Sequence, residues 1–129
     1  MGLKEQLDYL FNPRSVAVIG ASNQLGKWGY FILARLLESK SGKEIYAINK
    51  RETEVLGLKA YRSVADVPGP VDLVVIMVPF QGIIEVMHDC VRKGVKVAIV
   101  ISGGLAEIGG EGAKLEQEVV EIARRGGMR

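Results

Sequence analysis

A glycine-rich segment after the first strongly apolar run is the part of the chain best suited to binding chemistry. It reads Gly20-Ala21-Ser22-Asn23-Gln24-Leu25-Gly26-Lys27. The two glycines permit a tight turn and close approach of another backbone, while Ser22 and Asn23 can cap a helix or donate to a ligand. A helix that begins here offers free N–H groups and its positive dipole end to an anion. Because Lys27 opposes that dipole, we predict a phosphate or pyrophosphate seat, with a solvated lysine on an ordinary turn as the alternative.

The spacing in this segment differs from the common nucleotide fingerprints. Ser22 and Leu25 break the Gly-x-Gly-x-x-Gly pattern, and Trp28 stands where a P-loop needs Ser or Thr. The second apolar run ends in Asn49-Lys50-Arg51, whereas an NAD site needs an acidic residue there for the ribose. Basic residues instead suggest an extra phosphate on the adenosine ribose, as in NADP or coenzyme A. An ordinary charged loop is the alternative.

Four short apolar runs must position these loops: Val16–Ala21, Ile45–Ile48, Val71–Val78 and Val95–Ile101. Three are nearly continuous and rich in Val and Ile, which is typical of parallel strands buried on both faces. Strand alternating with helix predicts right-handed βαβ units. We therefore predict an α/β fold, a Rossmann-like doubly wound parallel sheet with helices on both faces.

Helical patterns lie before and between these runs. A short helix is predicted from Leu3 to Phe11, ahead of Asn12-Pro13. Three later helices have predicted apolar faces, formed by Phe31, Ile32, Leu36 and Leu37; by Ile83, Ile84, Met87, Cys90 and Val91; and by Leu115, Val119, Ile122 and Ala123. Gly94 and Gly126-Gly127 are expected to end the last two. The region 51–70 is less regular, with a turn at Gly57.

Ligands of open parallel sheets bind beyond the carboxyl ends of the strands. After the third and fourth runs, those ends hold Pro79-Phe80-Gln81 and Ser102-Gly103-Gly104. Together with the two loops already described, they define the predicted site.

Composition excludes several other functions. The 129 residues suit one domain, and a net charge of +2 without a basic tract argues against nucleic acid. The single cysteine, Cys90, excludes an internal disulfide and is interpreted as a core residue of a cytoplasmic protein. The longest apolar stretch is too short to span a membrane. No Cys/His cluster or carboxylate pair suggests a metal.

Several motifs resemble those of one enzyme family, and the likeness covers nearly the whole chain. The segment Phe11–Ser22 resembles the start of ADP-forming acetyl-CoA (acyl-CoA) synthetases. Further matches are Ile48–Lys50, Gly57–Tyr61, Val71–Ile76 with Val78-Pro79, and Ile101–Glu107. The chain is also similar to the CoA-binding domain of the succinyl-CoA synthetase α subunit, and to the N-terminal part of some protein acetyltransferases.

This resemblance implies where coenzyme A would lie. The Ser22–Gly26 loop would hold the pyrophosphate, and Lys50 would contact the phosphorylated ribose. Val78, Pro79 and Phe80 would wall the nucleotide, while Ile101, Ser102 and Gly103 would follow the pantetheine arm. The expected cofactor-binding set is Gly20, Ala21, Ser22, Asn23, Gly26, Lys27, Asn49, Lys50, Val78, Pro79, Phe80, Ile101, Ser102 and Gly103.

The resemblance also implies an activity for the parent enzyme. In the family, acyl-CoA, ADP and phosphate give acid, CoA and ATP through a phosphorylated histidine in the next domain. The only histidine here, His88, does not match that position and is interpreted as a surface residue. Residues 1–129 are expected to form one CoA-binding domain, an N-terminal fragment without catalytic residues.

The expected partners are coenzyme A or acyl-CoA and the downstream ligase domains or subunit, with a homo-oligomer as a further possibility. Two other functions stay open from the sequence. One is an NADP-binding domain of an oxidoreductase, and the other is a regulatory module of an acetyltransferase fusion.

Overall fold

The computed structural model describes residues 2–21, 28–39, 42–78, 82–101 and 110–128. Its helices are α1 (Leu3–Phe11), α2 (Trp28–Glu38), α3 (Ile83–Lys93) and α4 (Gly110–Arg125), with a 3₁₀ turn η1 (Val64–Asp66). Its strands are β1 (Ser15–Ile19), β2 (Glu44–Ile48), β3 (Glu54–Val55), β4 (Leu58–Tyr61), β5 (Leu73–Ile76) and β6 (Val97–Val100). The four predicted strands are therefore confirmed, although β1, β5 and β6 are shorter than the apolar runs that indicated them.

The strands form one sheet in the order β3-β4-β2-β1-β5-β6. β1 lies at the centre and pairs in parallel with β2 and β5, while β6 pairs in parallel with β5. All residues of β1 and β5 are buried, as their continuous apolar sequences predict. After β2 and the short strands β3 and β4, the chain crosses to the other side of β1 and forms β5. The carboxyl ends of β2 and β5 therefore lie on either side of that of β1.

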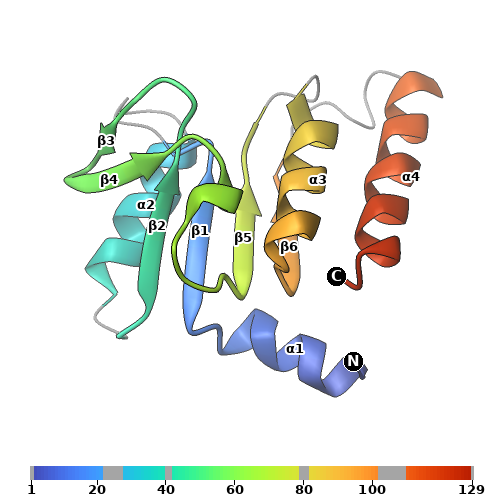
Figure 1. Cartoon of the computed structure of the whole chain (residues 1–129), viewed down its shortest axis with the longest axis horizontal. Helices are drawn as coiled ribbons and strands as arrows, with labels where there is room; N and C mark the ends of the chain where they lie inside the picture. Colours follow the sequence, from blue (N-terminus) through green and yellow to red (C-terminus); the bar gives the residue numbers. More distant parts are fainter. Residues whose placement is uncertain (1, 22–27, 40–41, 79–81, 102–109, 129) are drawn as a thin grey trace.

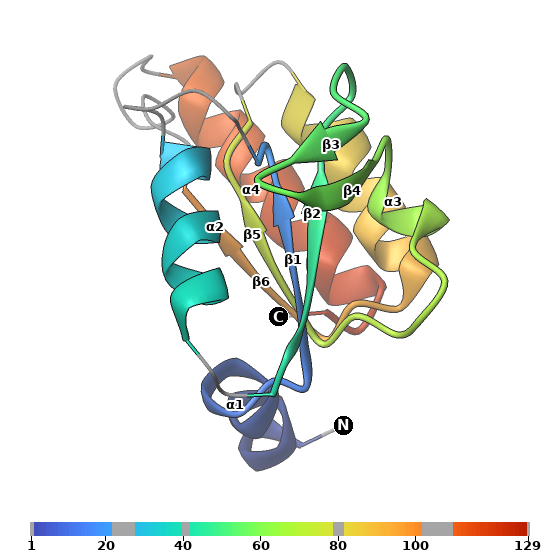
Figure 2. The same cartoon turned by 90° about the vertical axis from the view of Figure 1, so that its left-hand side faces the viewer.

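Helices cover both faces of the sheet, as expected for a doubly wound fold. Alternate residues of β1 point to opposite faces: Val18 packs in a cluster with Leu33 of α2, whereas Ala17 and Ile19 share a cluster with Met87 of α3. Figures 1 and 2 show α2 on one face and α3 and α4 side by side on the other. Helix α1 lies across the amino ends of the strands (Figure 1).

The buried face of α2 differs from the predicted one. Ile32 and Leu36 face the sheet as expected, but Phe31 and Leu37 are exposed, and Leu33 is fully buried instead. The helix is apolar over most of its length, so its sequence pattern does not specify which stripe packs on the sheet. The predicted faces of α3 and α4 are confirmed at the positions whose burial is described.

Region 51–70 contains a small hairpin that the sequence pattern did not indicate. β3 and β4 pair antiparallel, and the chain turns at Leu56 and Gly57, both with positive φ. Two successive positive φ values are typical of a type I′ hairpin turn. Because the two strands have only two and four residues, they carry little periodicity, whereas the turn at Gly57 was predictable.

A buried carboxylate fastens the amino end of the sheet. Asp72 accepts hydrogen bonds from the Arg14 backbone N–H at 2.9 Å and from Arg14 Nε at 3.3 Å. Ser15 Oγ donates to the Pro70 carbonyl and accepts from the Asp72 N–H. These bonds join the start of β1 to the segment that enters β5.

We expect Asp72→Asn to lower the free energy of unfolding by about 1–2 kcal/mol, because a charged acceptor becomes neutral while the shape is kept. Urea denaturation of both proteins measures the difference. An unchanged urea midpoint would show that the charge of the Asp72 carboxylate does not contribute to stability.

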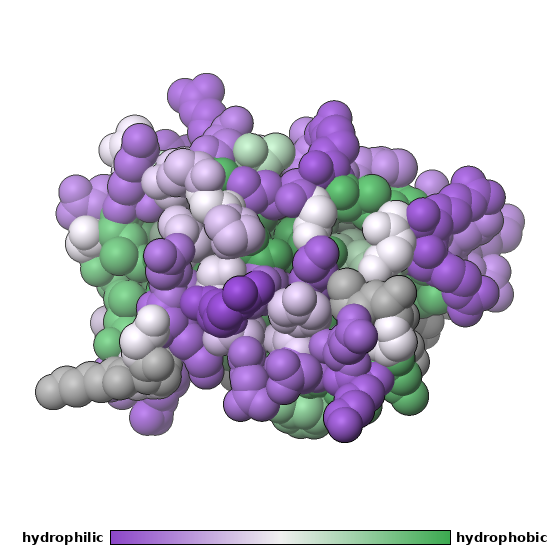
Figure 3. Space-filling model, turned by 60° about the horizontal axis from the view of Figure 1, so that its bottom comes forward, coloured by the Kyte–Doolittle hydropathy of each residue, from purple (hydrophilic) through white to green (hydrophobic). Residues whose placement is uncertain are grey.

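The face formed by the amino ends of the strands is mainly polar. Figure 3 shows hydrophilic side chains covering most of this face, with hydrophobic ones in smaller groups between them. Within the described ranges, no helix has the length and apolar character needed to cross a membrane.

Candidate functional site

The carboxyl ends of four parallel strands are joined at one edge of the sheet. Gly20 N and Ala21 N, just after β1, both donate to the Ile48 carbonyl at the end of β2. On the other side of β1, Met77 N donates to the Ile19 carbonyl at 2.8 Å, and Ile101 N donates to the Ile76 carbonyl at 2.8 Å. The residues that follow each strand therefore extend the ladder into the loops where ligands of this fold bind.

Two glycines allow the turn after β1 to pack against its neighbours without side chains between them. Gly20 has a φ of +94°, and a Cβ there would lie 2.1 Å from the Met77 carbonyl oxygen. A Cβ on Gly29, in the first turn of α2, would lie 2.1 Å from the Gly20 carbonyl oxygen. Strand, turn and helix are in backbone contact here, as close nucleotide approach requires.

Asn49 connects the loop after β2 to the loop after β1. Its Nδ2 donates to the Ala21 carbonyl at 2.8 Å. Its Oδ1 accepts from the backbone N–H groups of Arg51 at 2.7 Å and Glu52 at 2.8 Å. One side chain thus fixes the conformation of its own loop and its position relative to the glycine turn. Asn49 is therefore a positioning residue whose polar atoms are already used within the protein.

Lys50, the predicted phosphate contact, forms an ion pair with α3. Its Nζ lies 3.3 Å from Glu85 Oε2, and the two side chains are 64% and 68% exposed. Glu85 belongs to the first turn of α3, where a carboxylate is favoured by the helix dipole. Because α3 follows β5 and Lys50 follows β2, the pair links the segments after the two strands that flank β1.

Six of the predicted site residues can be placed in the structure. Gly20, Ala21, Asn49 and Lys50 lie together at the junction of the first two loops. Val78 is partly buried and packs on the α3 side of the sheet, and Ile101 is 40% exposed beyond β6. The other eight lie outside the described residues: Ser22, Asn23, Gly26, Lys27, Pro79, Phe80, Ser102 and Gly103.

His88 and Cys90 both belong to α3, and neither is among the predicted binding residues. His88 is exposed, and Cys90 is fully buried in the core, as predicted for each. Burial raises the pKa of the Cys90 thiol from 9.0 to about 12. Because the thiolate is the reactive form, the folded protein holds this sulfur in an unreactive state.

We expect iodoacetamide to leave Cys90 unmodified in the folded protein at pH 8 and to alkylate it fully in denaturant, as intact mass would show. The raised pKa also predicts a loss of stability above pH 9, since the unfolded thiol ionises there and the folded thiol does not until about pH 12. Rapid labelling under native conditions would contradict this burial.

Two residues of the site are absent from the sequence prediction. Glycine is unfavourable inside a helix, so Gly29 in the helical pattern after Lys27 was a usable signal of close packing. Glu85 carried no such signal, since an acidic residue in a first helical turn is explained by the dipole alone.

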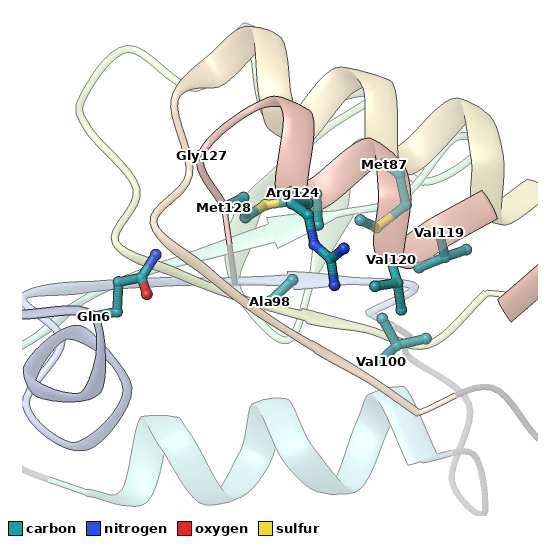
Figure 4. Close-up of a pocket in the computed structure, with 10 residues that line it drawn as sticks. Gln6, Met87, Ala98, Val100, Val119, Val120, Arg124, Gly127 and Met128 are labelled. Carbon is teal, nitrogen blue, oxygen red and sulfur yellow. The ribbon is translucent and has the colours of Figure 1, made fainter. Parts of the chain in front are cut away.

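A second surface lies beside β6, the outermost described strand on one side of the sheet. A groove of about 460 Å³ lies between β6 and α4 (Figure 4), lined by Gln6, Met87, Ala98, Val100, Val119, Val120, Ala123, Arg124, Gly127 and Met128. Val120 in this groove is 53% exposed, and Ile99 on β6 is also exposed. Among the strands that the structure describes, β6 is the last in the sheet order, so one side of its backbone has no described strand beside it. The carboxyl-edge site does not include these residues.

The fold and the arrangement of residues at the carboxyl ends of its strands define a Rossmann-like nucleotide-binding domain. The parallel sheet, the reversal of strand order beside β1 and the glycine turn in backbone contact with α2 are the features on which such domains bind nucleotides. Lys50, which is exposed just after β2, adds a positive charge suited to a phosphate.

The chain belongs to the CoA-binding domain family, whose family model, described as CoA binding domain, matches residues 14–129. It is 50% identical over 123 residues to the α subunit of ADP-forming acetate–CoA ligase II of Pyrococcus furiosus, covering 95% of this chain and 27% of that subunit. The crystal structure of PH0766 from Pyrococcus horikoshii OT3 superposes with a TM-score of 0.91 at 46% identity, covering 95% of this chain and 28% of the other.

A third relative is dinucleotide-forming acetyl-coenzyme A synthetase 1 of Ca. Korarchaeum cryptofilum, with a TM-score of 0.88 at 45% identity, covering 95% of this chain and 26% of that one. The chain thus spans about a quarter of the length of these relatives. The domain is a coenzyme A-binding module of the type found in ADP-forming acid–CoA ligases, and the NADP-dependent oxidoreductase reading is not favoured.

The described part of the carboxyl edge fits coenzyme A. The glycine contacts leave no side chain between the turn, β5 and α2, and an exposed lysine stands beside the end of β2. A nucleotide with several phosphates needs both features: backbone approach and positive charge.

Proposed function

We propose that this domain binds coenzyme A by its phosphorylated nucleotide end, as the CoA-binding module of an ADP-forming acid–CoA ligase. The observation that carries the proposal is the junction of the first two loops, where Asn49 ties the Lys50 loop to the glycine turn. In a member of the CoA-binding family, this junction places an exposed cation beside the glycine turn that follows β1.

Each described residue of the predicted site has a role in this proposal. Gly20 and Ala21 form the close turn that leads into the segment assigned to the pyrophosphate, and Asn49 holds the two loops in position relative to each other. Lys50 contacts the phosphate on the ribose. Val78 lies on the side of the nucleotide, and Ile101 follows the pantetheine arm. The same proposal assigns the pyrophosphate to the segment 22–26.

The parent protein would use this domain in the reaction acyl-CoA + ADP + phosphate → acid + CoA + ATP. The domain's own contribution would be to hold and orient the CoA end of the thioester, since we assign it no catalytic residue. The histidine that carries phosphate in this family would belong to another domain or subunit, so residues 1–129 would form one domain of a longer assembly.

The outward side of β6 and the groove beside α4 are a suitable surface for that remaining part of the ligase. Within the described residues β6 is an edge strand, a position that allows a further strand to pair, and the apolar groove next to it offers area to bury. Self-association of the isolated chain through this edge is the alternative, and sedimentation analysis of the chain alone would reveal it.

Calorimetric titration with CoA, NADP and NAD at fixed salt tests the proposal. We expect CoA to bind and the two dinucleotides to bind much more weakly. Binding of NADP without CoA would overturn the assignment. If CoA fails to bind the chain with or without the rest of the ligase, a regulatory module that has lost its site becomes the better account.

A further inference from the structure

Lys50 already has an anionic partner, although the proposed function gives it a phosphate to bind. Its Nζ lies 3.3 Å from the Glu85 carboxylate. Both side chains are more than half exposed, so the pair can separate without creating a buried charge. Any phosphate that approaches Lys50 therefore meets a carboxylate at the same ammonium group.

The backbone segments that carry Lys50 and Glu85 are fixed by more contacts than the two charged groups themselves. Asn49 anchors the Lys50 loop through three hydrogen bonds, and Glu85 stands in the first turn of α3, next to the buried Ile83 and Val86. The two charged groups are thus set opposite each other by the fold, while their exposed ends remain able to move. A carboxylate held in reach of the cation acts on every ligand that uses that cation.

The two possible partners of Lys50 differ in charge. At neutral pH a phosphate monoester carries roughly 1.5 to 2 negative charges, whereas a carboxylate carries one. The monoester therefore competes successfully for the ammonium group, but it must displace the carboxylate and then remain near it. Each of these two effects lowers the affinity for the monoester.

We propose that Glu85 is a specificity-determining residue that weakens recognition of the ribose phosphate by competing for Lys50. The inference rests on the proposed function, because it takes Lys50 as the contact of the 3′-phosphate. It names Glu85 as an internal competitor that reduces both the affinity for coenzyme A and the preference for coenzyme A over dephospho-CoA.

The variant Glu85→Gln removes the competing charge and keeps the size of the side chain. We expect it to bind CoA about two- to five-fold more tightly, the range that corresponds to the energy of an exposed ion pair. Dephospho-CoA lacks the monoester, so its affinity should stay the same. The discrimination between the two ligands should rise by the same factor.

A matched control separates this local effect from the general effect of one added positive charge. Glu38→Gln makes the same change in an exposed ion pair with Arg35 on α2, 3.8 Å apart, far from Lys50. The double variant Lys50→Ala/Glu85→Gln completes the test, because the gain should disappear once the lysine is absent. All titrations use one ionic strength, since exposed charges are screened by salt.

The outcomes distinguish the inference from the function on which it rests. Tighter CoA binding by Glu85→Gln alone, lost in the double variant, supports the inference. Unchanged or weaker CoA binding, or an equal gain for dephospho-CoA, overturns it while leaving CoA binding by the domain intact. A weaker affinity for both ligands would instead assign Glu85 to a ribose hydroxyl. If the wild-type protein shows no preference for CoA over dephospho-CoA, the assignment of Lys50 fails and this inference fails with it.

Discussion

Gly20→Ala is expected to destabilise the domain by about 2–5 kcal/mol, combining the cost of a left-handed conformation with that of a backbone overlap. The new Cβ would lie 2.1 Å from the Met77 carbonyl oxygen, and the backbone there has a φ of +94°. Relief requires β1 and β5 to separate where their loops begin. We therefore expect CoA binding to be lost even where the protein still folds, as thermal unfolding and calorimetry would show together.

Gly57→Ala is the matched control for this prediction. Gly57 has a similar φ of +84°, but a Cβ there meets nothing within 4 Å. It should cost only about 1–2 kcal/mol, the price of the left-handed conformation alone, and leave CoA affinity unchanged. Equal losses for the two variants would show that the contact with Met77 has no role.

Asn49→Ala is the second prediction with a large effect. It removes the hydrogen bond that joins the loops after β1 and β2, together with two that fix the conformation of the loop after β2. We expect the free energy of unfolding to fall by about 1.5–3 kcal/mol, since a part-buried carbonyl loses its donor. CoA affinity should fall by about ten-fold or more, because Lys50 loses its fixed position relative to the glycine turn.

Asn12→Ala controls for the substitution itself. Asn12 also donates through its side chain, to Asp8 at 3.2 Å, but on the exposed end of α1 at the opposite edge of the sheet. This variant should retain wild-type CoA binding. If Asn49→Ala also binds CoA like the wild type, the loop junction does not position the site.

The sequence predicted the fold where periodicity and burial agree. The runs that became β1 and β5 are continuous because both faces of the sheet are covered, and Gly94 ends α3 in a left-handed conformation, as expected. The hairpin β3–β4 escaped prediction because its strands are too short to show a period. The apolar run of β6 indicated a strand but not its place at the edge, since edge position depends on which segments pair.

For the site, the sequence identified the loops but not the contacts between them. The positions of Gly20 after β1 and of Asn49-Lys50 after β2 were predictable, because the apolar runs mark where the strands end, while their role in binding stays a prediction. The bond from Asn49 to the Ala21 carbonyl and the pairing of Lys50 with Glu85 join residues 28 and 35 positions apart. Such pairs depend on how the strands assemble, which no local pattern records.

Mapping amide chemical-shift changes in the ¹⁵N-labelled chain as coenzyme A is added would locate the binding site residue by residue. We expect saturable shifts at Gly20, Ala21, Asn49 and Lys50, with weaker changes at Lys50 when dephospho-CoA replaces CoA. The residues of the β6–α4 groove, such as Val100 and Val120, should stay unchanged. Shifts confined to that groove, with the carboxyl-edge residues unaffected, would contradict the account.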